Sequence, residues 1–157
     1  MKNDFDPFND ERDFNAEQNR FLKTLELGDG YEADFVNFET GSPEELAKII
    51  KEKLPNQKIT IIRISPDNYH LSDLLENNPE AIESDIAIIS GLDELESSDH
   101  ANDTNIFARF FNGLNHTRDI YADKYSFKMI ILATNSQQVK AQKSAPDFFS
   151  CTKRFEF

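Results

Sequence analysis

The chain has 157 residues, of which 38% are hydrophobic and 14 are phenylalanine, so it is long enough to bury the core of one domain. It has no apolar run near the roughly 18 residues that a membrane span needs, and no signal-peptide pattern, so we expect a cytoplasmic protein with no membrane partner. A net charge of −12 repels phosphate backbones and argues against nucleic acid as a partner.

The first half of the chain predicts helices and strands in alternation. Residues 1–12 are polar and rich in Asp, which predicts a flexible acidic tail before a single domain over residues 13–157. Apolar residues at helical spacing predict a helix over residues 14–27 that stops at Gly28. A short strand at 32–38, a helix at 42–54 and a second strand at 58–65 follow.

The second half continues this alternation. A helical region at 69–83 is interrupted near Pro79, and the unbroken apolar run at 85–90 predicts a strand that is covered on both faces. Strands that alternate with helices predict a doubly wound, mainly parallel α/β sheet of five strands. After a polar stretch at 93–104, the expected elements are a helix at 105–122, a strand at 127–134, a helix at 136–144 and a strand at 153–157.

The strand, loop and helix over residues 35–54 have the outline of a phosphate-binding loop. A working loop, G-x-x-x-x-G-K-[ST], needs backbone N–H groups around the phosphates, a Lys for the terminal ones and a hydroxyl for Mg²⁺. Aligned on this helix, the four required positions fall on Asn37, Ser42, Pro43 and Glu44, so all four are lost. Shifting the second glycine to Gly41 still leaves the Lys and the Ser/Thr missing.

The start of this helix also disfavours phosphate. Ser42 is predicted as its N-cap, Pro43 suits the first helical position, and Glu45 is expected to complete a capping box. The two carboxylates of Glu44 and Glu45 lie where an anion would bind, and Pro43 removes one donor. We therefore expect a helix start that satisfies its own N–H groups.

Two later strands carry motifs of nucleotide-binding proteins. "DIAIISGLDELES" resembles the Walker B segment of NACHT and other STAND-type NTPases, in which an apolar strand ends in an Asp associated with magnesium. Ser90 stands at that position here, whereas the next four residues, Gly91 to Glu94, match the motif. "MIILATNS" resembles the sensor strand of AAA+ and STAND proteins, with Asn135 at the polar sensor position.

The two ends of the domain resemble the same group. "FLKTLELGDGYEADFVNFET" and the C-terminal "SAPDFFSCTKRFEF" are similar to the opening and the ending of inactive STAND-like domains in multidomain bacterial proteins. Over residues 14–157 this resemblance implies a P-loop NTPase-like (ASCE-type) core with a degenerate phosphate loop. It further implies a non-enzymatic regulatory domain of a bacterial defence or signalling system, with a protein partner or fused effector or repeat domains.

The resemblance implies no catalytic residue, no metal and no bound cofactor. The vestigial positions of the nucleotide site are Gly41, Ser42, Ser90, Asp93, Glu94 and Asn135. Two alternatives stay open: an atypical switch domain that holds ATP or ADP through Asp93, Glu94 and Asn135, and an NTPase-like subunit associated with nucleic acid.

Other candidate residues are given structural roles. Arg109 and Arg118 lie on an amphipathic helix, where solvent-facing or salt-bridged arginine is expected. The single cysteine, Cys151, is expected to be buried as a small apolar side chain. Phe107, Phe110 and Phe111 are predicted core residues. Exposure of Phe148 and Phe149 would instead indicate a docking surface.

The three histidines, His70, His100 and His116, are far apart in the sequence, and their spacing does not suit a metal site.

Overall fold

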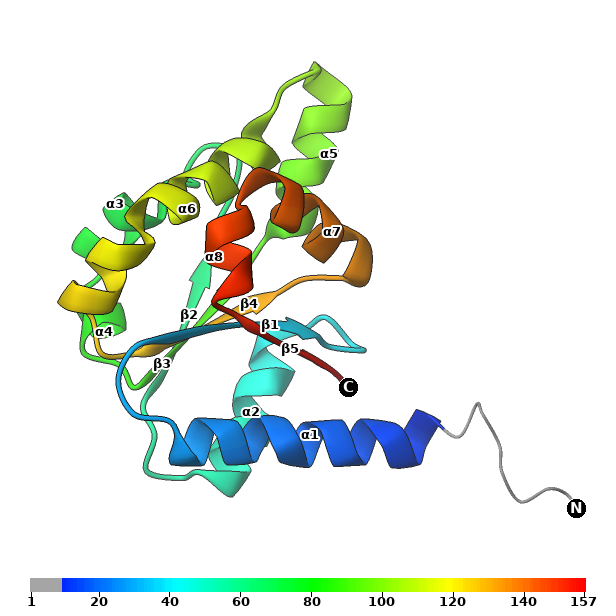
Figure 1. Cartoon of the computed structure of the whole chain (residues 1–157), viewed down its shortest axis with the longest axis vertical. Coiled ribbons are helices and arrows are strands. Elements are labelled where there is room, and N and C mark those ends of the chain that lie inside the picture. Colours follow the sequence, from blue (N-terminus) through cyan, green and yellow to red (C-terminus); the bar gives the residue numbers. More distant parts are fainter. Residues whose placement is uncertain (1–9) are drawn as a thin grey trace, which may run out of the picture.

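The computed structural model describes residues 10–157, and the side chains from residue 15 onward. Its centre is a five-stranded sheet in which all neighbouring strands are parallel, in the order β2-β3-β4-β1-β5 (Figure 1). The prediction of a doubly wound parallel α/β sheet is confirmed. The strands are β1 (Glu32–Asn37), β2 (Ile59–Arg63), β3 (Ile86–Ser90), β4 (Lys128–Leu132) and β5 (Lys153–Glu156).

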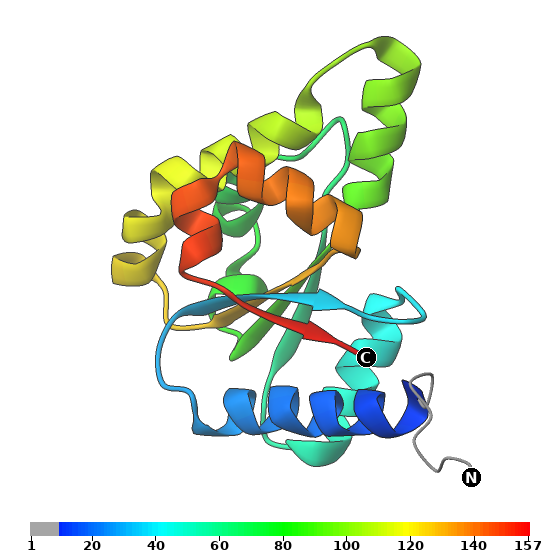
Figure 2. The same ribbon diagram turned by 45° about the vertical axis from the view of Figure 1, so that its right-hand side comes forward.

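Helices cover both faces of the sheet (Figure 2). One face carries α1 (Asp10–Leu27) and α2 (Pro43–Lys53). The other face carries α3 (Leu71–Glu76), α4 (Pro79–Ile82), α5 (Leu92–Asn102), α6 (Ile106–Lys124), α7 (Asn135–Ser144) and α8 (Pro146–Ser150). Because β4 lies between β1 and β3, the sheet has the strand order of ASCE-type P-loop NTPase-like folds.

Alternate residues of each strand feed the two halves of the core. Phe35 of β1 points toward α6 and α8, where its ring meets those of Phe111, Phe148 and Phe149. The next residue, Val36, points toward α1 and α2. Both are fully buried, and burial of such side chains stabilises the fold by about 1.5 to 3 kcal/mol each.

The exposed fractions of the phenylalanine side chains decide between a core role and a docking role. Phe107, Phe110 and Phe111 belong to the core, as predicted. Phe148 and Phe149 are only 2% and 7% exposed, so they form no docking surface.

The long helix α1 packs against the edge strand β5 through aromatic side chains. Phe21 is fully buried, and its ring centroid lies 5.1 Å from that of Phe155 and 5.3 Å from that of Phe157. The first described helix and the last strand therefore share one part of the core.

Three local predictions differ from the structure. Helix α1 begins at residue 10, so residues 10–12 of the expected tail are helical, while residues 1–9 of that prediction lie outside the described residues. The polar stretch at 93–104 is mostly the helix α5, whose buried side comes from Leu92 and Leu95. Cys151 is exposed, so its predicted burial was wrong. It lies just after the short helix α8, whose Phe148 and Phe149 side chains fill the nearby core.

No helix among the described residues is long and apolar enough to cross a membrane.

Candidate functional site

A small cavity of about 70 Å³ lies at the carboxyl ends of β1, β3 and β4. In open parallel sheets this edge, where the strand order reverses, is where ligands bind. Three of the six vestigial positions line the cavity, namely Gly41, Ser90 and Asp93. The other lining residues are Asn37, Phe38, Gly91, Leu92, Leu132, Ala133, Thr134 and Gln137.

The loop before α2 binds its own backbone. The Ser42 hydroxyl caps the helix by accepting a hydrogen bond from the Glu45 N–H at 3.2 Å. The Ser42 N–H donates to Thr40 Oγ1 at 3.2 Å, so the reciprocal bond from Glu45 that a capping box requires is absent. The predicted capping box is therefore half formed, because the neighbouring threonine takes the donor that Glu45 would have bonded.

The first turn of α2 carries negative charge that is partly neutralised by β2. Glu44 stands where a working phosphate loop has its magnesium-binding hydroxyl, and it forms an ion pair with Arg63 at the end of β2. Both side chains are more than half exposed, so the pair is screened by water. An incoming phosphate would meet Glu44 and Glu45 instead of a lysine.

Ser90 and Gly91 connect β3 to α5 at the floor of the site. The Ser90 carbonyl accepts a hydrogen bond from the Ile64 N–H at 2.8 Å, which fixes the end of β3 beside β2. Gly91 has φ +119°, and a Cβ at this position would lie 2.1 Å from the Ile64 carbonyl oxygen. Only glycine fits this turn, which places Asp93 in the first turn of α5 at the cavity.

Gln137 is the buried polar residue of the site, and sequence reasoning missed it. It is 3% exposed, and its side-chain amide donates to Asp93 Oδ1 at 2.6 Å and to Glu96 Oε1 at 2.8 Å. Its oxygen accepts from the Thr134 N–H at 2.9 Å, and Thr134 caps α7 in return. The threonine and the glutamine three residues later, T-x-x-Q, match the capping-box pattern and could have predicted this pair.

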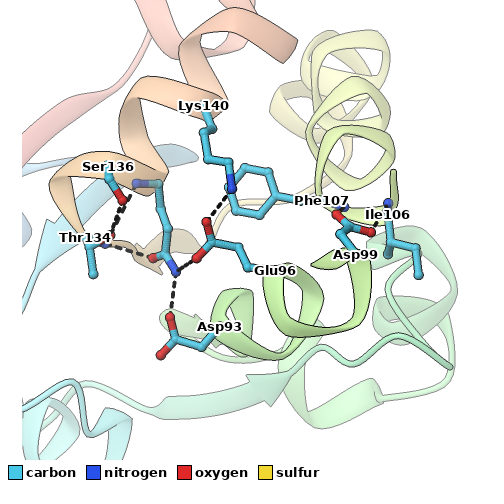
Figure 3. A network of polar contacts seen from close by, with 9 residues as sticks. Asp93, Glu96, Asp99, Ile106, Phe107, Thr134, Ser136 and Lys140 are labelled. Atoms are coloured by element: carbon cyan, nitrogen blue, oxygen red, sulfur yellow. Dashed lines mark hydrogen bonds and ion pairs between the residues drawn. The ribbon is translucent and has the colours of Figure 1, made fainter. Parts of the chain in front are cut away.

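An ion pair adds a second contact between α5 and α7. Lys140 Nζ lies 2.5 Å from Glu96 Oε2 and 4.8 Å from the centre of the Phe107 ring (Figure 3). Burial disfavours the charged form of Glu96, but the hydrogen bonds from Lys140 and Gln137 outweigh it and lower the pKa of this carboxyl. Glu96 is therefore an ionised partner that holds α5 against α7.

The far end of α5 is tied to the start of α6. Asp99 accepts hydrogen bonds from the N–H groups of Ile106 at 2.7 Å and Phe107 at 3.0 Å (Figure 3). It also accepts one from the Thr104 hydroxyl at 2.7 Å. Partial burial opposes ionisation, yet these donors lower the pKa of Asp99. The N-cap residue of α6, Asn105, makes no side-chain cap, and the Asp99 carboxylate binds the first N–H groups of α6 from another helix.

The remaining predicted positions lie away from the cavity. Glu94 and Asn135 are exposed and do not line it, whereas Gln137, two residues after Asn135, does. Arg109 is exposed beside a groove of about 340 Å³ between α3 and α6, and Arg118 donates to the Asn115 carbonyl at 2.7 Å. Among the described residues, no cluster of three or more His, Cys, Asp or Glu side chains could hold a metal ion.

The strand order and the position of the cavity define the class of this protein: it is an α/β protein with a P-loop NTPase-like fold. Among solved structures, the chain is similar to the Aeropyrum pernix ORC2 protein in its ADP form, with 12% sequence identity and a TM-score of 0.47. The similarity covers 99% of this chain and 51% of that one, so the chain spans about half the length of that structure. No protein-family model matches the chain, and no curated protein matches its sequence.

Proposed function

We propose that this domain is a non-enzymatic protein-interaction and regulatory module, derived from a STAND-type NTPase and acting in the cytoplasm as part of a bacterial defence or signalling system. One observation carries the proposal: the place of the nucleotide site holds a cavity of only about 70 Å³. Pockets that enclose small molecules usually measure about 300 to 1,000 Å³. The space fits a few water molecules rather than a nucleotide.

The chemistry around the cavity supports the same proposal. Phosphoryl transfer depends on a lysine at the phosphates and on ligands for Mg²⁺. Pro43 stands at the first of these places, and Glu44 and Ser90 replace the hydroxyl and the carboxylate of the second. The amide of Gln137 donates a hydrogen bond to Asp93, so one of the two carboxylate oxygens, Oδ1, is already engaged. We expect neither hydrolysis nor tight binding of ATP.

The polar network beside the cavity supports a structural role for the vestigial nucleotide site. Gln137, Glu96 and Lys140 connect α5 to α7, and Asp99 connects α5 to α6. In a switch, such helices move when the nucleotide changes. Here they are joined to one another by the protein's own groups, which favours a fixed scaffold that presents surfaces to a protein partner.

Titration calorimetry with millimolar ATP and ADP, with and without Mg²⁺, tests the proposal. We expect no heat of binding and no change in melting temperature, whereas a ligand at 100 times its Kd would stabilise the fold by about 2.7 kcal/mol. Micromolar binding that is lost in Asp93→Ala but kept in Glu52→Ala would overturn the proposal in favour of the ATP/ADP-binding switch. Glu52 is the control because it is an exposed carboxylate on α2 and does not line the cavity.

A further inference from the structure

The strand β5 forms one edge of the sheet, and its backbone groups alternate between two directions. The backbone N–H groups of Lys153 and Phe157 point toward the neighbouring strand β1. The Lys153 N–H donates to Asp34 Oδ1, and the Phe157 N–H donates to the Asn37 carbonyl at 3.1 Å. Along a strand, alternate residues point their N–H and C=O groups to opposite sides. Arg154 and Glu156 therefore direct theirs outward, away from β1.

Two side chains of α1 bind these outward groups. Arg20 Nη2 donates to the Arg154 carbonyl at 2.9 Å, and Glu17 Oε2 accepts from the Glu156 N–H at 3.3 Å. The two side chains also form an ion pair with each other at 2.9 Å. In a parallel sheet, the same carbonyl and N–H would bond to a single residue of an added strand, opposite Phe155. The Glu17–Arg20 pair thus occupies the place of one strand residue.

This occupation is easily reversed. The Arg20 and Glu17 side chains are 51% and 35% exposed, and exposed ion pairs stabilise a fold only weakly. Helix α1 itself is held by other residues, since Phe21, Leu22 and Leu25 are buried in the core. Displacement of the Glu17 and Arg20 side chains therefore leaves the residues that anchor α1 in place.

The cationic side chains beside the β5 edge favour a partner segment with acidic side chains. A groove of about 360 Å³ between α1 and β5 is lined by three cationic side chains, Arg20, Lys23 and Lys153, and by one carboxylate, Glu32. Phe155 lies in the core cluster on the α1 face of the sheet, and alternate residues share a face. Residues of an added strand opposite Lys153 and Phe155 would point to this same face. Acidic side chains at alternate positions would meet the cations.

We propose that the outer edge of β5 binds an extended acidic segment of a partner protein, which pairs parallel to β5 and displaces the Glu17 and Arg20 side chains. This mode is strand addition, in which main-chain hydrogen bonds give affinity and alternate side chains give specificity. The inference rests on the proposed function, because it names the surface by which the domain meets its protein partner.

The first test uses a fluorescent peptide, Thr-Val-Glu-Val-Glu-Thr, and a matched peptide with Lys in place of both Glu residues. The anisotropy of each peptide is measured against the full chain, and amide shifts are recorded on ¹⁵N-labelled protein. We expect the acidic peptide to bind at least tenfold more tightly and to shift the Arg154 and Glu156 amides. Equal binding of the two peptides, or shifts that spare β5, would overturn the inference.

Three variants test the mechanism. Glu156→Pro removes the outward N–H, which does not pair with β1, and proline is tolerated in edge strands at such positions. We expect it to weaken binding at least tenfold, whereas Glu156→Thr, which keeps the N–H, binds within threefold of the natural chain. Glu17→Ala frees the same N–H and removes a repelling carboxylate, so we expect affinity to rise several-fold. Unchanged affinity in a folded Glu156→Pro protein, or a drop in Glu17→Ala, contradicts strand addition.

A charge variant keeps the test decisive if the proline variant does not fold. Lys23→Glu is expected to weaken binding of the acidic peptide at least fivefold, while Lys48→Glu, an exposed lysine on α2, leaves it unchanged. Equal effects of both would overturn the inference. Dimerisation of Glu17→Ala without peptide, measured by ultracentrifugation, would also overturn it by making a second copy the occupant.

The same labelled sample separates the two proposals. ATP is added while the amides of Gly91 and Gln137 are followed at the cavity. Shifts there would overturn the proposed function while the peptide result at β5 still stands. If ATP does not shift these amides and the peptide does not bind, only the inference of strand addition at β5 would be overturned.

Discussion

Asp34 accepts a hydrogen bond from the backbone N–H of Lys153 at 3.2 Å, so a carboxyl group of β1 that is only 1% exposed holds the first residue of the edge strand β5. The other Asp34 oxygen, Oδ2, and Glu32 Oε2 are both buried without a hydrogen-bond partner. Burial, helped by the hydrogen bond and charge of Glu32, raises the pKa of Asp34 to about 8. A proton shared between the two carboxyl groups would give both oxygens a hydrogen-bond partner.

The stability of the fold should therefore decrease toward alkaline pH. The folded-state pKa of about 8 lies above the ordinary 3.8, so between these values the folded chain keeps a proton that the unfolded chain releases. The free energy of unfolding should fall as pH rises through this window. Asp34→Asn should remove most of this slope and stabilise the fold at pH 8 by roughly a few kcal/mol.

Urea denaturation from pH 5 to pH 9 measures this effect. Asp29→Asn is the control, because Asp29 is an exposed loop residue. If Asp34→Asn kept the slope of the natural chain, the shared proton would have to be abandoned.

Gly91→Ala should destabilise the domain. The new Cβ would lie 2.1 Å from the Ile64 carbonyl oxygen, at a φ of +119° that side-chain-bearing residues rarely adopt. We expect a loss of about 2 to 4 kcal/mol in thermal or urea denaturation. Gly113→Ala, in α6 with open space around its Cβ position, should instead stabilise by about 0.5 to 1 kcal/mol. Equal effects of the two substitutions would contradict the described turn.

Gln137→Ala should cost about 1 to 3 kcal/mol of stability, because it removes a helix cap and leaves Asp93 and Glu96 without their amide donor. Gln137→Glu should be worse at pH 7 than at pH 4, since it would add a third carboxylate to this cluster. Asn135→Ala, at the exposed neighbouring position, should change stability by less than about 0.5 kcal/mol. A larger loss in Asn135→Ala than in Gln137→Ala would show that the polar network is wrongly placed.

Asp99→Ala should loosen the junction of α5 and α6. The carboxylate caps two N–H groups of α6, so we expect a loss of about 1 to 2 kcal/mol at neutral pH. Because the folded-state pKa of Asp99 is lowered, its contribution is present above the ordinary value of 3.8 and is lost as pH falls through the folded-state pKa. The difference between the natural chain and Asp99→Ala should therefore shrink in acid, as measured by thermal unfolding at pH 7 and pH 3.

The sequence predicted the central strands of the sheet well because β2, β3 and β4 are mainly apolar runs between polar loops. It failed at α5, where Leu92 and Leu95 are the buried residues and nearly all the others are polar, so apolar periodicity is almost absent. That helix depends on tertiary contacts from Glu96 and Asp99, which connect it to α7 and α6.

The candidate site was predicted only in part, because residue types can be read from the sequence but contacts between distant residues cannot. The loss of phosphate-loop chemistry was visible at Pro43 and Glu44, since it depends on residue type alone. Gln137 was missed because its importance comes from lying opposite Asp93, 44 positions away in the chain. Asp34 was missed because a lone acidic residue in a strand shows its burial only after α1 and β5 have covered it.

The contact of Phe21 with Phe155 and Phe157 has a consequence for synthesis of the protein. On the ribosome, α1 emerges early, but the rings that complete its buried face belong to residues 153–157. Until then Phe21 lacks its partners, and β1 lacks its neighbour on that side. Long-range pairings of this kind slow folding and leave apolar surface exposed for longer. Nascent chains of this domain should thus depend on chaperones that cover the α1 face until β5 is made.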